Sequence, residues 1–471
     1  MIGAAVMEAF EISDYTPIIN AVSEYAARNN IRMHTPGHAG GGDLPPWLAD
    51  FARYDVTELP GLDSLYEASG IIANSERLAA ELFGAGETLF SAGGNTLCIQ
   101  AMLSVLPRGS RVLMPRAAVH RSAINAAALL GLEPVFMPMT DGNMVDLQVM
   151  DELLISQKPS AVYVTSPDYY GRMADIAAIA KLAERHGALL LVDNAHGSHL
   201  KFLRPDEHPI TLGAHMSADS AHKTLGVLTG GAMLHISKKY RPPCPMRPRP
   251  VKELMSVFGS TSPSYPILMS LEYACAVLRG RGGEMYAALA EKAAAFRKKA
   301  MEYGFRLIDG KIDPIRITLS GKALGFTGHK LFDELMRRGL TPEWADEAWC
   351  VLLPSVFSGP REFERAEEIL LGATLGAMQG AVRPAAVAMN GGDVRGEQPK
   401  AAHIPARRMP LAKAMFAGSC EVPVSEALGR ISGQTVSVCP PGTPIIVAGE
   451  EIDEISQALL INSRIFSIKV V

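Results

Sequence analysis

Between residue 76 and about residue 240, short apolar runs alternate with segments of helical periodicity, and this alternation restricts the possible folds strongly. Runs such as Leu189–Val192 are apolar on both faces, as in a strand covered by helices on both sides. We therefore predict an α/β fold with a mainly parallel sheet. The predicted strands are Thr88–Phe90, Arg111–Met114, Pro134–Met137, Ala161–Thr165, Ala188–Asp193 and Gly231–Ile236. The predicted helices lie near residues 95–106, 118–131, 147–156 and 173–186.

Polar residues follow several of these strands. Ser91, Ser166, Asp193 and the loop that carries Lys223 all come at or just after the carboxyl end of a predicted strand. In a parallel sheet these ends meet at one edge, and ligands bind in the crevice outside them. We therefore expect one crevice to collect these side chains.

Lys223 and Asp193 are the two residues with the clearest chemical interpretation. An amine for a Schiff base and an anion for a pyridine nitrogen are the groups that hold pyridoxal phosphate. Each also has an ordinary alternative: Lys223 as a solvated surface charge, and Asp193 as a helix N-cap. The glycines Gly226–Gly231, which follow Lys223, favour the first interpretation because they let backbone and cofactor approach closely.

A second group of residues offers phosphate and ring contacts. The turn Gly93–Thr96 precedes a predicted helix, whose free N–H groups suit a phosphate, although such turns are common. Ser220 and His222 flank Lys223 and add further contacts. His120 opens another predicted helix, where it either lies over a flat ring or merely starts the helix.

The histidines His196 and His199 lie close to Asp193 in the sequence and superficially suggest a metal site. The His-x-x-His spacing is a weak signal, and the six cysteines are scattered without CxxC spacing. We predict no metal, and we interpret the cysteines as reduced core thiols.

The remaining chain divides into further segments. Residues 1–75 hold a predicted helix near Tyr15–Asn29 and glycine-rich loops, and residues 76–300 form the large domain. A smaller α+β domain is expected at 301–381, a linker or surface loop at 382–408, and a C-terminal module at 409–471.

Charge and hydropathy limit the partners. The formal net charge is −4, and charged residues make up 20% of the 471 residues, so nothing indicates nucleic-acid or membrane-surface binding. The chain shows neither a signal peptide nor an apolar run of about 18 residues. We expect a soluble, cytoplasmic protein that acts on a small molecule.

Several motifs together resemble one family. They are Thr35-Pro36-Gly37-His38, Thr57–Leu65, Phe83-Gly84-Ala85, Asp193–Leu200, Ser220–Leu225, Ser260–Tyr265 and Pro440-Pro441-Gly442-Thr443-Pro444. In these stretches, and over nearly its whole length, the chain is similar to the bacterial Orn/Lys/Arg decarboxylases. These are pyridoxal phosphate enzymes of fold type I, like aspartate aminotransferase. The resemblance implies a seven-stranded type of sheet and smaller C-terminal α+β parts.

The resemblance also implies roles for matching residues. Lys223 would carry the cofactor, Asp193 would pair with its pyridine nitrogen, and His196 would join them in catalysis. His120 would stack on the ring, with Ala195 against the opposite face. The phosphate would be held by Gly94, Asn95, Thr96, Ser220 and His222. Ser260, Thr261 and Ser262 would lie near a partner subunit's cofactor, which implies a homodimer or higher homo-oligomer with shared active sites.

The chain departs from the family pattern at several positions. Ala39 stands where lysine is usual, Ser64 replaces an acid, and Gly230 replaces a glutamine. Asn194 stands where glutamate is usual and Asp219 where glutamine is common, and Cys439 takes the place of a tyrosine. These changes leave Lys223 and Asp193 intact but put the substrate in doubt.

The implied reaction is decarboxylation of an amino acid, with a basic one (lysine, ornithine or arginine) expected first. A distal cation would need a carboxylate, and by resemblance and position Glu58, Asp63, Glu343 and Asp346 are candidates; each has the alternative of a solvated loop acid. Two other functions remain open: a transaminase or acyl-CoA-condensing enzyme on the same frame, and a cofactor-binding pseudoenzyme that regulates a paralogue.

Overall fold

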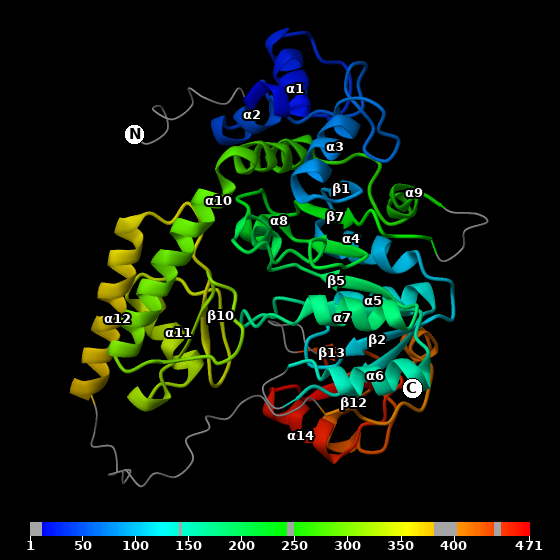
Figure 1. The fold of residues 1–471 in the computed structure, drawn as a ribbon, viewed down its shortest axis with the longest axis vertical. Helices are drawn as coiled ribbons and strands as arrows, with labels where there is room; N and C mark the ends of the chain where they lie inside the picture. The colour runs from blue at the N-terminus through cyan, green and yellow to red at the C-terminus, as the bar shows by residue number, and fades with distance from the viewer. Residues whose placement is uncertain (1–11, 141–143, 243–248, 381–402, 438–443) are drawn as a thin grey trace.

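The computed structural model describes residues 12–140, 144–242, 249–380, 403–437 and 444–471. The proline turn at 440–444 lies almost wholly outside these ranges, as do Cys244, Cys439 and most of the expected linker 382–408. Within the described part, three bodies surround a central sheet domain (Figure 1). N-terminal helices lie at one end, a smaller domain along one side, and a C-terminal module at the other end.

The central domain is built on a seven-stranded sheet with the order β1-β7-β6-β5-β4-β2-β3. Its strands are β1 (Glu87–Ser91), β2 (Arg111–Pro115), β3 (Glu133–Met137), β4 (Ala161–Thr165), β5 (Leu189–Asp193), β6 (Met216–Asp219) and β7 (Ala232–Ile236). Neighbours from β3 through β6 are parallel, whereas β7 pairs antiparallel with β6 and with β1. The predicted mainly parallel α/β fold is confirmed, and β6 is a strand that the sequence pattern missed.

Alternate residues of the central strands enter two apolar layers. Leu190 and Val192 of β5 pack in a core with α6 (Leu147–Gln157) and α7 (Ile176–Arg185). Leu191 enters the opposite core, which holds α4 (Gly94–Ser104) and α5 (Arg121–Leu130). The continuous apolar run at 189–192 therefore follows from burial on both faces.

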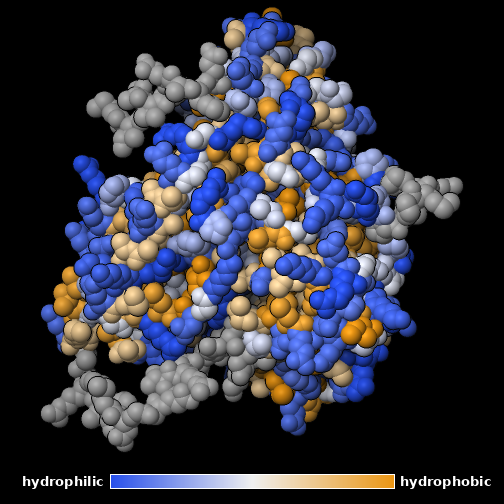
Figure 2. Space-filling model, in the orientation of Figure 1, coloured by the Kyte–Doolittle hydropathy of each residue, from blue (hydrophilic) through white to orange (hydrophobic). Residues whose placement is uncertain are grey.

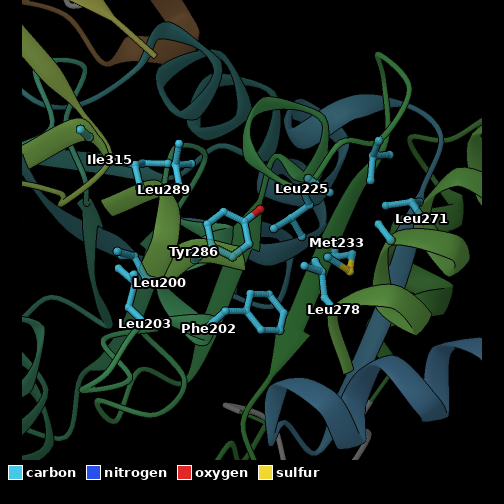
Figure 3. Packing of buried hydrophobic residues seen from close by; sticks show 14 of the residues in the cluster. Leu200, Phe202, Leu203, Leu225, Met233, Leu271, Leu278, Tyr286, Leu289 and Ile315 are labelled. Atoms are coloured by element: carbon cyan, nitrogen blue, oxygen red, sulfur yellow. The ribbon is translucent and has the colours of Figure 1, made fainter. Parts of the chain in front are cut away.

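Other helices complete the central domain and its N-terminal end. They are α1 (Pro17–Ala27), α2 (Pro46–Ala52), α3 (Ile71–Phe83), α8 (Ala221–Thr224), α9 (Val251–Ser256) and α10 (Tyr265–Glu302), with short 3-10 turns η1 (Ile12–Tyr15) and η2 (Ser198–Phe202). The 38-residue helix α10 runs from the sheet into the smaller domain. Figure 3 shows its Leu271, Leu278 and Tyr286 packing with Phe202 and Met233 in one apolar cluster.

The smaller domain carries a four-stranded sheet with the order β10-β11-β9-β8. Its elements are β8 (Arg306–Leu307), β9 (Ile317–Ser320), η3 (Lys322–Leu324), α11 (Gly328–Arg337), β10 (Trp344–Ala345), β11 (Cys350–Leu352) and α12 (Pro360–Gly380). The C-terminal module holds α13 (Leu411–Met415), β12 (Cys420–Pro423), η4 (Val424–Glu426), β13 (Val436–Ser437), β14 (Pro444–Ile446), α14 (Glu454–Asn462) and β15 (Ser467–Val470).

The C-terminal module is anchored to the central domain by a buried ion pair. Arg116 Nη1 and Nη2 donate to Glu450 Oε1 and Oε2 at 3.0 and 2.9 Å. The two side chains are 0% and 1% exposed. A bidentate geometry of this kind fixes orientation as well as distance.

The molecular surface is mixed in character. Figure 2 shows hydrophobic residues interspersed with hydrophilic ones on the face it displays. Within the described ranges, none of the helices combines the length and the hydropathy that a membrane span requires.

Helix α1 is attached to α10 through Glu272. The Glu272 carboxylate accepts hydrogen bonds from the backbone N–H groups of Ile18 and Ile19, at 2.9 and 2.7 Å. It therefore serves the first turn of α1, whose N–H groups have no partner inside the helix. Burial raises the pKa of Glu272 to about 7, despite these hydrogen bonds.

The raised pKa of Glu272 predicts a pH-dependent stability. A carboxyl whose folded pKa exceeds its unfolded value of 4.5 contributes stability fully below pH 4.5 and loses it as the pH rises through 7. We expect Glu272→Gln to remove this part of the pH dependence, about 1–3 kcal/mol between pH 4.5 and 7.5. Urea unfolding of both proteins across this range measures it. Parallel curves for the two proteins would contradict the prediction.

Candidate active site

A cavity of about 330 Å³ opens at the carboxyl ends of β4, β5 and β6. Its walls come from the starts of α4 and α5, the loop after β4, and the segment around α8. The residues that line it are Gly94, Asn95, Thr96, Ile99, Ala117, Ala118, His120, Ser122, Thr165, Asp168, Tyr169, Tyr170, Asp193, Ala195, His196, Ser220, His222 and Lys223. The crevice expected from the strand ends is present and contains Asp193 and Lys223, but Ser91 and Ser166, which were expected there, do not line it.

Asp193 ends β5 and is 2% exposed. Its Oδ1 accepts hydrogen bonds from Asn95 Nδ2 at 3.0 Å and from the Ala195 N–H at 3.2 Å, and its Oδ2 accepts one from the Tyr163 hydroxyl at 3.0 Å. Burial raises the pKa of Asp193, while nearby His120 and Lys223 act in the opposite direction. None of the three hydrogen-bond donors is charged, so the site favours a further, cationic donor on the cavity side.

Lys223 lies on the short helix α8, directly after β6. Its Nζ is 3.0 Å from His196 Nε2 and 5.9 Å from the centre of the Tyr169 ring. The carbonyl of the next residue, Thr224, accepts a hydrogen bond from the hydroxyl of Tyr286, the α10 residue at the centre of Figure 3. The long helix therefore helps to fix the backbone that carries Lys223.

His196 is 3% exposed and connects two parts of the molecule. Its Nε2 faces Lys223, and its Nδ1 accepts a hydrogen bond from Arg316 Nη2 at 3.1 Å. Arg316 precedes β9 of the smaller domain. Burial lowers the pKa of His196 well below its usual value, and the charge of Arg316 lowers it further, so the ring is neutral at pH 7.

His120 is both a helix cap and a wall of the cavity. It is the N-cap of α5, and its Nδ1 accepts a hydrogen bond from the Ser122 N–H at 3.2 Å. Burial lowers the pKa of His120, and Lys223 and Arg121 contribute in the same direction against the pull of Asp193. The ring is therefore neutral and fixed in orientation at the cavity.

Part of the cavity wall has the features of an anion site. Gly94 has a φ of +73°, which favours glycine, and it starts α4, so that Asn95 and Thr96 lie in the first turn. The N–H groups of a first turn are available to an anion. Ser220 and His222 line the same cavity, and His222 Nδ1 donates to the Gly231 carbonyl at 3.1 Å.

Other candidate residues lie outside this cavity. Asp63 accepts hydrogen bonds from the N–H groups of Ser69, Gly70 and Ile72 at the start of α3, so it has a capping function there. Glu58 is exposed on its loop. Thr261 and Ser262 are exposed as well and contribute nothing to the cavity wall of their own chain.

Glu343 and Asp346 sit behind two tyrosines of the cavity wall. The Tyr169 hydroxyl is 3.4 Å from Glu343 Oε1, and the Tyr170 hydroxyl donates to Asp346 Oδ2 at 2.7 Å. Trp344 contacts both tyrosine rings edge-on, at 5.3 Å between centroids. The two acids therefore meet the cavity through Tyr169 and Tyr170.

Sequence reasoning missed these tyrosines, Tyr163, Thr165 and Arg316. Tyr169 and Tyr170 follow the Ala161–Thr165 strand shortly after Ser166, so their position after a strand end was a usable signal. The sequence gives no local signal for Arg316, because this residue contacts His196 from 120 positions away in the sequence.

Asp219, which does not line the cavity, forms a wholly buried cluster with His208 and His235. Asp219 Oδ2 accepts hydrogen bonds from His208 Nε2 at 3.0 Å and from Asn194 Nδ2 at 2.9 Å. Burial alone would raise the pKa of Asp219, but the adjacent His208 and His235 and the hydrogen bonds from His208 and Ser217 lower it to about 2.

Two imidazoles and a carboxylate are also a common set of metal ligands. His208 Nδ1, however, accepts from the Ile210 N–H at 3.3 Å, which leaves the ring proton on Nε2, facing Asp219. A metal-ligating nitrogen must be unprotonated. We therefore interpret the cluster as a hydrogen-bonded network. The structure also shows that two departures from the family pattern, Asn194 and Asp219, form one bonded pair.

Comparisons with known proteins show which sequences this chain is similar to. Residues 16–314 match the family described as Orn/Lys/Arg decarboxylase, major domain. The chain is 31% identical to the uncharacterized protein YaaO of Bacillus subtilis, with 96% of the chain and 95% of that protein covered. It is 30% identical to an arginine decarboxylase of the same organism, with 93% and 91% covered.

Solved structures show a similar fold. Lysine decarboxylase A of Pseudomonas aeruginosa superposes with a TM-score of 0.82 at 18% identity, covering 98% of this chain and 81% of that one. The lysine decarboxylase LdcF of Francisella novicida gives a TM-score of 0.80 at 17% identity, with 97% and 81% covered.

The hydrogen bond between Asn194 and Asp219 predicts that substitutions of the two residues have non-additive effects on the free energy of unfolding. Asn194→Asp places a second carboxylate against buried Asp219, and we expect it to lower the free energy of unfolding by about 3 kcal/mol or more. The double variant Asn194→Asp/Asp219→Asn re-forms an amide–carboxylate bond, so it should recover about 1–3 kcal/mol relative to additivity. Urea unfolding measures each value, with Asn30→Asp, at an exposed position, as the control. Additive costs would contradict the prediction.

Proposed function

Because the chain belongs to the Orn/Lys/Arg decarboxylase family, we propose that it is a pyridoxal phosphate-dependent enzyme that decarboxylates a basic amino acid. Lysine, ornithine and arginine are the candidate substrates, and the products are the corresponding amine and carbon dioxide. One observation carries the proposal: the Lys223 amine and the buried Asp193 carboxylate line the same cavity at the carboxyl edge of the sheet.

The polar groups that line the cavity match those of pyridoxal phosphate. Asp193 lacks a charged donor among its hydrogen-bond partners, and a protonated pyridine nitrogen supplies one. Among the described residues, Asn95 Oδ1 and Thr165 Oγ1 are buried without a partner, and both residues line the cavity. Gly94, Asn95, Thr96, Ser220 and His222 form the end suited to a phosphate, and His120 and Ala195 supply surfaces for the two ring faces.

The protein's own groups then have distinct tasks. When bound, pyridoxal phosphate supplies an electron sink for the electrons left on Cα after carbon dioxide departs. Asp193 keeps a proton on the pyridine nitrogen and stabilises the charge that develops there. Lys223 Nζ and His196 Nε2, 3.0 Å apart, are the groups that return a proton to Cα.

For a basic substrate, the distal cation is assigned to the side of the cavity formed by Tyr169 and Tyr170. Glu343 and Asp346 lie behind these hydroxyls and supply the negative charge. Asp63 and Glu58 lie outside the cavity of their own chain, and a role for them in substrate binding requires the neighbouring subunit.

The functional unit in this proposal is a homodimer or a higher homo-oligomer with shared active sites. Ser260, Thr261 and Ser262 are exposed and lie outside their own cavity. Large apolar side chains are also exposed nearby in the sequence and in the N-terminal segment, including Val257 at 68%, Trp47 on α2 at 75% and Met33 on a loop at 93%. A second copy of the chain accounts for both features.

Product analysis tests the reaction. Purified protein with pyridoxal phosphate and a panel of amino acids should release carbon dioxide and an amine from a basic substrate. Asp193→Ala should still bind the cofactor on Lys223 but lose activity by about 100-fold or more, because the electron sink is weakened. Survival of activity in Asp193→Ala would contradict this role. A keto acid product would indicate an aminotransferase, and cofactor binding without turnover would indicate a pseudoenzyme.

The assignment of the distal cation is tested separately. We expect Glu343→Gln and Asp346→Asn to raise KM for the basic substrate by about 10-fold, the equivalent of about 1.4 kcal/mol. The rate constant kcat should change less, since neither Glu343 nor Asp346 lines the cavity that contains Lys223. Glu347→Gln, an exposed acid beside them, is the matched control. Equal KM values for all three variants would place the cation elsewhere.

A further inference from the structure

The hydrogen bonds of His196 define which of its ring nitrogens carries the proton. Arg316 Nη2 lies 3.1 Å from His196 Nδ1. A guanidinium group donates hydrogen bonds and accepts none, so Nδ1 must be the unprotonated acceptor. In a neutral imidazole the proton then resides on Nε2, the nitrogen that lies 3.0 Å from Lys223 Nζ.

This tautomer has a consequence for Lys223. An Nε2–H group donates to Lys223 Nζ, and only an uncharged amine has a lone pair to accept it. A charged ammonium would itself need to donate to Nε2, which the proton on that atom prevents. The arrangement therefore suits the neutral form of Lys223, which is the form that attacks an aldehyde.

We propose that Arg316 is a positioning residue for Lys223: by donating to His196 Nδ1, it holds the imidazole as the Nε2–H tautomer and keeps the lysine amine uncharged. This inference rests on the proposed function, in which Lys223 binds the cofactor. The inference goes beyond the proposed function because it assigns the smaller domain a role at the site: Arg316 directly precedes β9 of that domain.

The placement of Arg316 is strongly constrained. The side chain is 0% exposed, and a Cβ atom on Gly171 would come within 2.5 Å of its Cγ. Gly171 has a φ of +91°, so both space and backbone conformation call for glycine there. Arg297 Nη1 donates to the carbonyls of Pro314 and Arg316 at 2.8 Å, which fixes the backbone. Arg316 Nη1 also lies 3.4 Å from the Tyr169 carbonyl.

Burial and the Arg316 guanidinium both disfavour a positive charge on the His196 ring. The other titratable groups that face this ring are Lys223 on α8, His120 before α5 and His199 on η2. Arg316 interacts electrostatically with two acids, Asp168 and Asp313. Asp313 Oδ1 is also 2.8 Å from His199 Nε2. A neutral His196 therefore lies between the guanidinium of Arg316, which stays charged, and the amine of Lys223, which accepts the Nε2–H hydrogen bond only when it is uncharged.

The first test reads the tautomer directly in protein without cofactor. Protein labelled with ¹⁵N-histidine is measured by solid-state NMR, in which protonated and unprotonated ring nitrogens resonate in separate regions. The chain has 12 histidines, and His196→Gln assigns the signal by its loss. We expect the Nε2–H form in the wild type and in Arg316→Lys, which keeps a donor and a charge. Arg316→Met, which keeps most of the side-chain volume, should give a mixture or the Nδ1–H form.

The second test reads the charge of Lys223. Condensation of its amine with the aldehyde of added pyridoxal phosphate releases water, and its rate follows the uncharged amine fraction. We expect the pH at half-maximal rate to rise by about one to two units in Arg316→Met and to stay unchanged in Arg316→Lys. A rise in this pH without a change of tautomer would assign the effect to the charge of Arg316 and overturn the proposal.

An Nδ1–H form of His196 in the wild-type protein would overturn the proposal without any variant. The two levels of interpretation can also fail separately. If the wild type does not condense with pyridoxal phosphate at all, the proposed function fails. The NMR experiment on unloaded protein still decides whether Arg316 sets the tautomer.

Discussion

The structure depends on the burial of one carboxylate at the end of a strand that is covered on both faces. Removing an ion from water costs several kcal/mol unless other groups compensate. Asp193 obtains three hydrogen bonds, from α4, β4 and the turn that follows β5. These bonds join the helix with anion-site features to the strand that carries the carboxylate. The position of the cavity follows from this arrangement, since its other walls start at the neighbouring strand ends.

A second buried carboxylate, that of Asp219, helps to position the first. Asp219 ends β6 and accepts a hydrogen bond from Asn194, which is the residue next to Asp193. Tyr286 of α10 donates a hydrogen bond to the carbonyl of Thr224, the residue after Lys223, and Arg316 of the smaller domain donates one to His196. The residues that line the cavity are therefore positioned by the sheet, by helix α10 and by the smaller domain. The polar groups that make these contacts, such as Asn194, Asp219 and Arg316, are buried between these parts.

Much of this architecture was predictable, because burial leaves a clear pattern in the sequence. The strand Leu189–Asp193 was identified from its apolar run, and Lys223 was singled out because glycines and a second buried strand follow it in the sequence. Strand β6 was missed because Met216-Ser217-Ala218-Asp219 is short, contains small and polar residues, and takes its place through pairing with β5 and β7. Asp63 was a candidate for substrate binding, but the start of α3 needs its carboxylate as a cap. The contact between Arg316 and His196 joins two domains, and no local pattern encodes it.

The central claim is that Lys223 is the residue that binds pyridoxal phosphate. Borohydride reduction of the protein with the cofactor bound converts the C=N bond to a stable amine, and peptide mass spectrometry then locates the adduct. The account predicts a single modified peptide that contains Lys223, and no adduct at this peptide in Lys223→Arg. Modification of a different lysine, or an unmodified Lys223 peptide at saturating cofactor, would contradict it.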